Sequence, residues 1–151
     1  MSKVFTMCFV ENNNQVLLQR RVKKPFKGLW NAPGGKVEAF ESPLEACKRE
    51  IQEETGLAIE NVSFRGIMTV TNENQKRSDV LMLFHTKEVS GILSSSDEGE
   101  VAWVETEKIY SYENTPESFT YLLPYILETD STLTGKIIYN KKRIEIFDIN
   151  I

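Results

Sequence analysis

Three glutamates are the strongest candidates for chemistry in this sequence of 151 residues: Glu50, Glu53 and Glu54. Their i, i+3, i+4 spacing would place them within one arc of about 100° on a helix. Carboxylates this close repel one another, and a divalent cation would offset the repulsion; hard oxygen ligands suit Mg²⁺ or Mn²⁺. Without a cation we expect the pKa of at least one of them to be raised. The alternative is an ordinary solvated helix face, because Glu is common at protein surfaces.

The neighbouring residues favour the cation site. From Gly35 to Leu57 the sequence reads G-x5-E-x7-R-E-U-x-E-E-x-G-U, where U is a bulky aliphatic residue, and every specified position is filled. With this pattern of 23 residues the chain resembles the Nudix hydrolases. The resemblance implies the fold of that family, an α/β (or α+β) sandwich of the α/β/α type with a mixed sheet and two main helices.

The resemblance also implies a metal site. Glu50, Glu53 and Glu54 would bind Mg²⁺, with Mn²⁺ as the alternative, on the diphosphate of a nucleotide, and the backbone carbonyl of Gly35 would be a further ligand. This arrangement is physically consistent, because attack of water on phosphorus adds negative charge to an already charged substrate. The implied partner is a small-molecule nucleotide.

The remaining motif residues receive roles from the same resemblance. Glu41 and Arg49 would hold the loop and the helix together through a charge-assisted contact. One of the metal-bound glutamates, Glu53 before Glu50, would activate the attacking water. In some family members that base lies outside the motif, and Glu98, in a later acidic stretch, is then our candidate. The alternative for this stretch is an ordinary polar turn.

The flanks of the motif resemble the Nudix enzymes that hydrolyse oxidised purine nucleoside triphosphates. Trp30 and Asn31 precede the glycines, and Lys36 follows them. In that subset an Asn at the position of Asn31 contacts the purine, and an amide can both donate and accept hydrogen bonds. We therefore take Trp30, Asn31 and Lys36 as candidates for substrate binding. The alternatives are a core aromatic for Trp30 and a turn residue for Asn31.

These residues predict a Mg²⁺-dependent pyrophosphohydrolase. It would split a nucleoside triphosphate, with an oxidised purine such as 8-oxo-dGTP as first choice, into the monophosphate and pyrophosphate. The alternatives are another substrate (ADP-ribose, a nucleotide sugar, a dinucleotide or a pterin triphosphate) and a protein of this fold that binds a nucleotide without cleaving it. Nucleic acid is disfavoured as a partner, because no extended basic and aromatic platform is evident. A homodimer is left open.

A helix must position the three glutamates, and its capping signals are clear. Ser42 and Glu45 match a capping box, and Pro43 suits the first helical position. Gly56 suits a left-handed helix end. The apolar residues at helical spacing, which we expect to be buried, are Leu44, Cys47 and Ile51.

Strand patterns surround that helix. Alternating or β-rich segments predict strands within 3–10, 15–20, 58–71, 78–89 and 100–105. The order of strands and helices favours a mixed sheet with helices packed on its faces.

A second helix and a final hairpin complete the chain. The helix should begin at Thr115–Pro116 and be kinked or broken at Pro124, which cannot donate a backbone hydrogen bond. Its apolar stripe follows helical spacing: Phe119, Leu122, Leu123, Ile126 and Leu127. The segments 135–139 and 143–149 then predict a hairpin.

Composition limits the class of protein. With 18 Lys and Arg against 22 Asp and Glu, the net charge is −4, which disfavours a general binder of polyanions. The length suits a single domain over 1–151. A basic loop contains Arg20, Arg21, Lys23, Lys24 and Lys27, and it either steers phosphates or is simply solvated.

The cysteines and the apolar runs indicate the compartment. Cys8 and Cys47 lie among apolar neighbours and are expected to be small core residues rather than a disulfide. The start of the chain does not resemble a signal peptide, and no apolar run approaches the ~20 residues that span a bilayer. We therefore expect a cytoplasmic protein without membrane contact.

Overall fold

A mixed sheet of eight strands forms the centre of the computed structural model, which describes residues 2–23 and 26–151. Seven strands follow the order β10-β9-β5-β6-β1-β2-β3, and β8 also pairs with β2. Their bounds are β1 Val4–Asn12, β2 Gln15–Arg20, β3 Trp30–Asn31, β5 Ser63–Asn72, β6 Arg77–Thr86, β8 Val101–Glu105, β9 Leu133–Asn140 and β10 Arg143–Asn150. The mixed sheet that the sequence predicts is confirmed.

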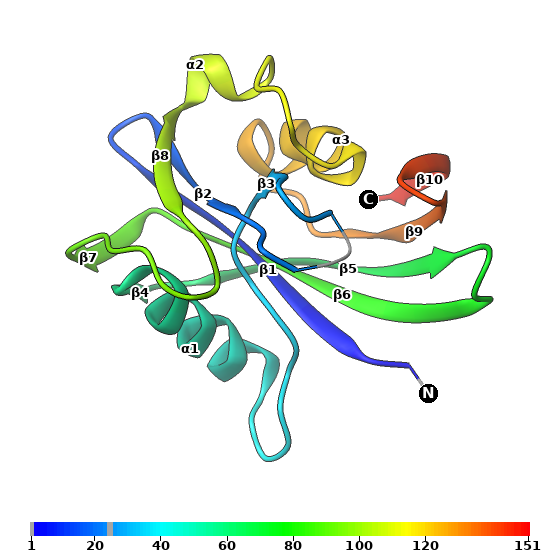
Figure 1. Cartoon of the computed structure of the whole chain (residues 1–151), viewed down its shortest axis with the longest axis horizontal. Helices are drawn as coiled ribbons and strands as arrows, with labels where there is room; N and C mark the ends of the chain where they lie inside the picture. The colour runs from blue at the N-terminus through cyan, green and yellow to red at the C-terminus, as the bar shows by residue number, and fades with distance from the viewer. Residues whose placement is uncertain (1, 24–25) are drawn as a thin grey trace.

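Two helices cover opposite faces of this sheet, α1 (Pro43–Thr55) on one side and α3 (Glu117–Leu127) on the other (Figure 1). The alternation along β1 divides the core accordingly. Met7 and Phe9 belong to the apolar cluster that contains the α3 residues, whereas Cys8 and Val10 belong to the cluster that contains the α1 residues. The result is the α/β/α sandwich expected from the sequence.

Helix α1 begins and ends where its sequence predicts. The hydroxyl of Ser42 accepts a hydrogen bond from the N–H of Glu45, whose carboxylate accepts one from the N–H of Ser42. Gly56 ends the helix with a left-handed φ of 76°. Cys47 and Ile51 are buried as expected, but Leu44 is 39% exposed, so its predicted burial is wrong. The first turn of the helix runs past the apolar cluster, and Phe40 just before it is fully exposed.

Helix α3 runs through Pro124 and ends three residues later, so no break occurs at the proline. Four of its five predicted apolar residues are fully buried, and Leu127 is partly buried. Arg65 on β5 anchors the end of this helix, because it donates hydrogen bonds to four backbone carbonyls at and just after that end. These contacts hold the carbonyl groups that a helix end leaves without partners.

A small separate sheet and a short helix were not predicted. Strands β4 (Leu57–Glu60) and β7 (Glu88–Gly91) form a separate two-stranded sheet beside α1, and α2 (Thr106–Ile109) is a single turn. The sequence predicted one β-rich stretch over 58–71, but Asn61 adopts a left-handed φ of 48° and divides it between the two sheets. The final hairpin is confirmed as β9 and β10.

The two cysteines are buried and unpaired, as the sequence predicts. Their thiols face each other between β1 and α1, where hydrogen bonding with Cys47 and burial raise the pKa of Cys8 well above its ordinary value. Among the described residues, no helix has the length and apolar character needed to span a bilayer.

Candidate active site

The glycine loop before α1 lies directly on β1. The hairpin of β1 and β2 is paired only at its end, and the loop runs along β1 where the two strands separate. The N–H of Thr6 donates to the carbonyl of Gly35 at 2.8 Å, and the N–H of Cys8 donates to that of Pro33 at 2.9 Å. A Cβ at Gly34 would lie 2.0 Å from the carbonyl oxygen of Thr6, so a side chain does not fit there.

Gly35 brings this loop against the first of the three glutamates. A Cβ at Gly35 would lie 2.6 Å from the carboxyl carbon of Glu50, closer than real contacts allow. The glycine therefore lets backbone and carboxylate approach each other, which is the use of glycine at crowded ligand sites. Two hard oxygen donors predicted for the metal, the Gly35 carbonyl and the Glu50 carboxylate, belong to adjacent residues in space.

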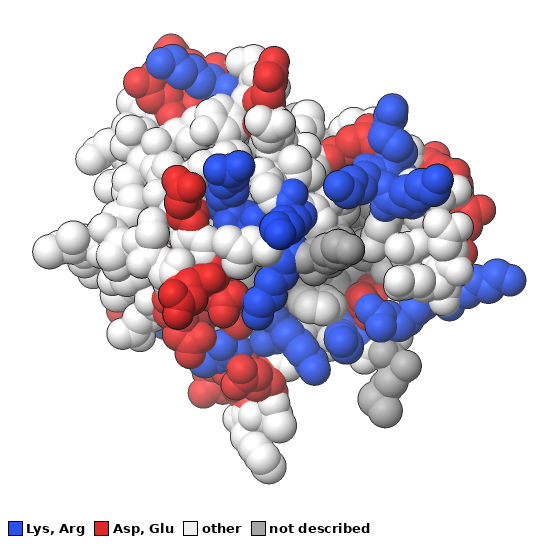
Figure 2. Space-filling view, viewed as in Figure 1, with Lys and Arg blue, Asp and Glu red and all other residues white. Residues whose placement is uncertain are grey.

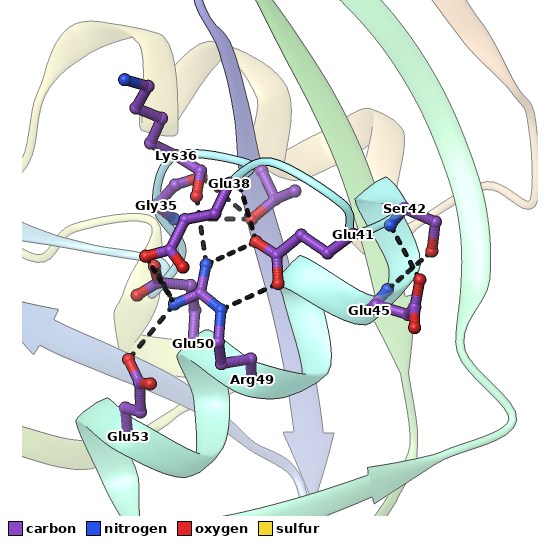
Figure 3. A network of polar contacts seen from close by, with 10 residues as sticks. Gly35, Lys36, Glu38, Glu41, Ser42, Glu45, Arg49, Glu50 and Glu53 are labelled. Carbon is purple, nitrogen blue, oxygen red and sulfur yellow. Dashed lines mark hydrogen bonds and ion pairs between the residues drawn. The ribbon is translucent and has the colours of Figure 1, made fainter.

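Arg49 organises the carboxylates around this contact (Figure 3). Its Nε and Nη2 donate to the two oxygens of Glu41 at 2.9 and 2.7 Å, a bidentate pair. Its Nη1 donates to Glu50 at 2.9 Å and to Glu53 at 3.2 Å, and its Nη2 also donates to the carbonyl of Lys36 at 3.2 Å. The guanidinium lowers the pKa of Glu41 to about 2 and thus keeps that carboxylate ionised. One arginine thereby ties the loop to the helix.

Glu54 lies deeper than its neighbours. Its side chain is buried, and Oε1 has no hydrogen-bond partner among the described residues. Burial raises its pKa to about 8; the charges of Glu50 and Glu98 add to the rise, whereas the Gln19 amide and the Gly34 N–H oppose it. Burial is also the largest cause that raises the pKa of Glu50, before the charges of Glu53 and Glu98. The expected rise is confirmed, with burial as a larger cause than repulsion.

The three glutamates lie at different depths. Glu54 is buried, the Glu50 side chain is 15% exposed and the Glu53 side chain is 60% exposed. Within the described parts of the chain, no three acidic, His or Cys side chains converge closely enough to hold a metal ion as they stand. Arg49 donates hydrogen bonds to Glu50 and Glu53. A cation would therefore have to displace the guanidinium from these carboxylate oxygens.

The chemistry of these residues nevertheless fits a divalent cation. Burying a carboxylate oxygen without a hydrogen-bond partner is energetically unfavourable, and Oε1 of Glu54 is such an atom. A bound cation would satisfy it and would reverse the pKa shift. Glu50, Glu53 and the Gly35 carbonyl would supply further hard oxygens. Glu98, in the loop between β7 and β8, is close enough for its charge to act on both Glu50 and Glu54.

A cavity of about 490 Å³ adjoins the glycine loop on the α3 side of the sheet. Gly34, Gly35 and Asn31 are among its lining residues. The Oδ1 of Asn31 accepts a hydrogen bond from the N–H of Ala32 at 2.8 Å, and no described residue engages its Nδ2. The amide donors of Asn31 are thus available in a cavity of the size that small ligands occupy.

Two other predicted substrate residues lie outside the lining of this cavity. Trp30 packs edge-on against Tyr112, with ring centroids 6.4 Å apart, and joins the α3-side core. The side chain of Lys36 points away from the carboxylates, while its carbonyl accepts from Arg49 (Figure 3).

Several cavity residues were not predicted. Four of them line it from three different strands: Gln19 from β2, Arg77 and Asp79 from β6, and Tyr139 from β9. They share no local motif. The signal that could have found them is the alternation of side chains along each strand, which places these residues on the same face of the sheet. Figure 2 shows Lys and Arg side chains around a hollow on this face. Of the basic loop, Arg21 lines the cavity, and Lys24 lies outside the described residues.

Comparison with known proteins identifies the class. The NUDIX domain family model matches residues 1–123, so the chain belongs to the Nudix family and is a Nudix hydrolase. Such enzymes generally use a divalent metal such as Mg²⁺. The crystal structure of a MutT protein from Bacillus halodurans superposes with a TM-score of 0.88 at 29% identity, covering 98% of this chain and 97% of that one.

Relatives with different substrates are similar to this chain. The ADP-ribose pyrophosphatase of Methanocaldococcus jannaschii is 34% identical over 93 residues, which cover 62% of this chain and 55% of the relative. The oxidized purine nucleoside triphosphate hydrolase of Mus musculus is 26% identical over 127 residues, which cover 84% and 81%.

Proposed function

We propose that this Nudix hydrolase is a Mg²⁺-dependent pyrophosphohydrolase that converts a nucleoside triphosphate and water into the monophosphate and pyrophosphate, with an oxidised purine nucleotide such as 8-oxo-dGTP as first choice. The observation that carries the proposal is the junction at Gly34 and Gly35, where the cavity meets the carboxylates of α1. A nucleoside in the cavity would present its phosphates to Glu50 and its neighbours.

The chain's residues have separate tasks in this reaction. Glu50, Glu53, Glu54 and the Gly35 carbonyl would hold Mg²⁺, which supplies neutralisation of phosphate charge when bound. Glu53 would accept the proton of the attacking water; its exposure suits a group that must reach solvent and substrate. Glu50 and Glu98 are the alternatives for this base, and both are close to the same carboxylates.

Asn31 supports the choice of a purine. Its available amide donors face the cavity and suit acceptor atoms on a purine edge. The mouse relative that acts on oxidised purine triphosphates matches along most of both chains, which also supports this choice. ADP-ribose is the second candidate, because the archaeal pyrophosphatase has the higher identity over the shorter match.

The test is product release from a panel of nucleotides with Mg²⁺ and then with a chelator. The panel contains 8-oxo-dGTP, dGTP, the other triphosphates, ADP-ribose and nucleotide sugars. We expect 8-oxo-dGTP to give the highest kcat/KM, with pyrophosphate as product. Preference for ADP-ribose would keep the carboxylate chemistry and overturn the substrate. Nucleotide binding without turnover would indicate a sensor rather than an enzyme of this class.

Substitution of Asn31 tests recognition of the base. We expect Asn31→Ala to raise KM for purine triphosphates by roughly tenfold, because one hydrogen bond to the base is lost. The value of kcat should change less, and pyrimidine triphosphates should be affected less. An equal loss for every nucleotide would contradict a role of Asn31 in base recognition.

A further inference from the structure

The floor of the cavity contains a carboxylate that no predicted role uses. Asp79 lies on β6, opposite Val70 of β5, which in turn pairs with Ile137 of β9. These three residues form one row across the sheet, and all of them line the cavity. Asp79 is the sole acidic side chain among the described lining residues.

Asp79 is held in place without being saturated. Its Oδ1 accepts a hydrogen bond from the backbone N–H of Lys3 at 3.0 Å, and its Oδ2 accepts one from Nη2 of Arg77 at 3.1 Å. The side chain is 20% exposed. An ionised carboxylate offers about four lone-pair sites, so each oxygen keeps acceptor capacity toward the cavity. The group is therefore a fixed acceptor pair.

Such a group selects the part of a nucleotide that it can contact. It repels phosphate and accepts N–H donors. The phosphates would lie at the Gly35 end of the cavity, so the base would be the part of the nucleotide that Asp79 contacts. A guanine edge carries two adjacent donors, N1–H and the 2-amino group, that match both oxygens of a carboxylate. An adenine edge presents a ring acceptor beside its amino group, which a carboxylate disfavours.

We propose that Asp79 determines base specificity by accepting the two N–H donors of a guanine-type base. The inference rests on the proposed function and names its base. Oxidation of guanine at C8 leaves this edge unchanged. Asp79 would therefore distinguish guanine from other bases, but it would not distinguish oxidised from unoxidised guanine. Tyr139, from a hairpin outside the segment that matches the family model, bounds the same region with Phe26, their ring centroids 6.2 Å apart.

Binding of three monophosphates tests the proposal by calorimetry. On this edge dGMP offers two adjacent donors and dIMP offers one, whereas dAMP offers an amino group beside a ring acceptor that the carboxylate repels. We expect the wild-type protein to bind them in that order. Asp79→Asn keeps an oxygen for the Lys3 N–H but loses the acceptor pair. It should weaken dGMP by roughly ten- to hundredfold and bring the three affinities together. Asp148→Asn, the same change at an exposed carboxylate of β10, is the matched control and should change nothing.

The outcomes separate this proposal from the proposed function. Equal affinities of the wild-type protein for dGMP and dIMP, or an unchanged order in Asp79→Asn, would overturn the role of Asp79 even if triphosphates are cleaved. An equal loss for all three probes would show that Asp79 only supports the sheet, and a urea titration of the variant would reveal it. If triphosphates were not cleaved, but the preference for dGMP and its loss in Asp79→Asn were both observed, the proposed reaction would be overturned and the role of Asp79 in base recognition would stand.

Discussion

Two arginines each gather several oxygen atoms at a helix, and they differ in what those oxygens are. Arg49 on α1 binds the carboxylates of Glu41, Glu50 and Glu53. Arg65 on β5 binds backbone carbonyls after α3, and the residue is only 4% exposed. The partners of Arg49 raise its pKa, whereas burial lowers that of Arg65.

The difference separates chemistry from stability. Carboxylates can exchange an arginine for a metal ion, so the Arg49 contacts can be rearranged when a substrate binds. Backbone carbonyls at a helix end cannot exchange the arginine for a metal ion in this way, and Arg65 is the donor that joins them to β5, so we expect the Arg65 contacts to persist. We therefore expect changes near Arg49 to alter turnover with little loss of stability, and changes at Arg65 to do the reverse.

The largest expected effect is on turnover. Glu53→Gln should lower kcat by about a thousandfold, because a metal ligand and the candidate base are lost together. Stability should hardly change, since Glu53 is largely exposed and its pair with Arg49 is a surface contact. Steady-state kinetics with Mg²⁺ and urea unfolding measure the two quantities. Near-normal Mg²⁺-dependent turnover would show that this account of the carboxylates is wrong.

The largest expected effect on stability is at Arg65. Arg65→Met should lower the free energy of unfolding by about 3–5 kcal/mol, because four carbonyls lose the hydrogen bonds of a buried guanidinium. Arg143→Met removes an 84% exposed arginine paired with Glu117 and is the matched control, with an expected loss of about 0–1 kcal/mol. Urea titration measures both variants. A similar loss in both variants would show that the buried contacts of Arg65 add no more stability than an exposed ion pair.

A smaller effect tests the geometry of Arg49. Arg49→Lys keeps the charge but cannot form the bidentate pair with Glu41 while reaching Glu50. We expect kcat to fall by roughly ten- to hundredfold and the free energy of unfolding by about 1 kcal/mol. The corresponding Arg65→Lys should lose more stability but keep kcat per folded molecule. If Arg49→Lys lost stability alone, its contacts would be structural, like those of Arg65.

The smallest effect appears in the dependence of stability on pH. Glu54 keeps its proton up to about pH 8 in the folded protein, whereas an ordinary glutamate releases it near 4.5. The folded state therefore binds more protons between these values, and metal-free stability should fall as pH rises through this window. Glu54→Gln should flatten the decline while lowering turnover. Melting temperatures from pH 5 to 9 with a chelator test this; equal slopes in both proteins would contradict the raised pKa of Glu54 in the folded state.

Local signals predicted the motif helix well. Its capping box, its glycine end and the spacing of its glutamates depend on residues within a few positions of one another. The same local logic was wrong for Leu44, and of the kink or break predicted at Pro124 the break does not occur. Leu44 has the right spacing, but the turn that carries it extends beyond the apolar cluster. Pro124 lacks an N–H, yet α3 continues past it because its apolar stripe is packed on the sheet and Arg65 anchors its end.

The sequence by itself determined the family, because the family depends on a short, fully specified pattern, and the order of its strands and helices predicted the mixed sheet. The same pattern supplies the carboxylates that we propose as ligands of a divalent cation. The tertiary structure alone decided that Arg65 anchors α3, that Glu54 is buried with an unpaired oxygen, and that Asp79 shares a cavity with Asn31. Each of these facts joins residues from distant strands and helices. Their contacts arise from strand order and register, which local spacing does not encode.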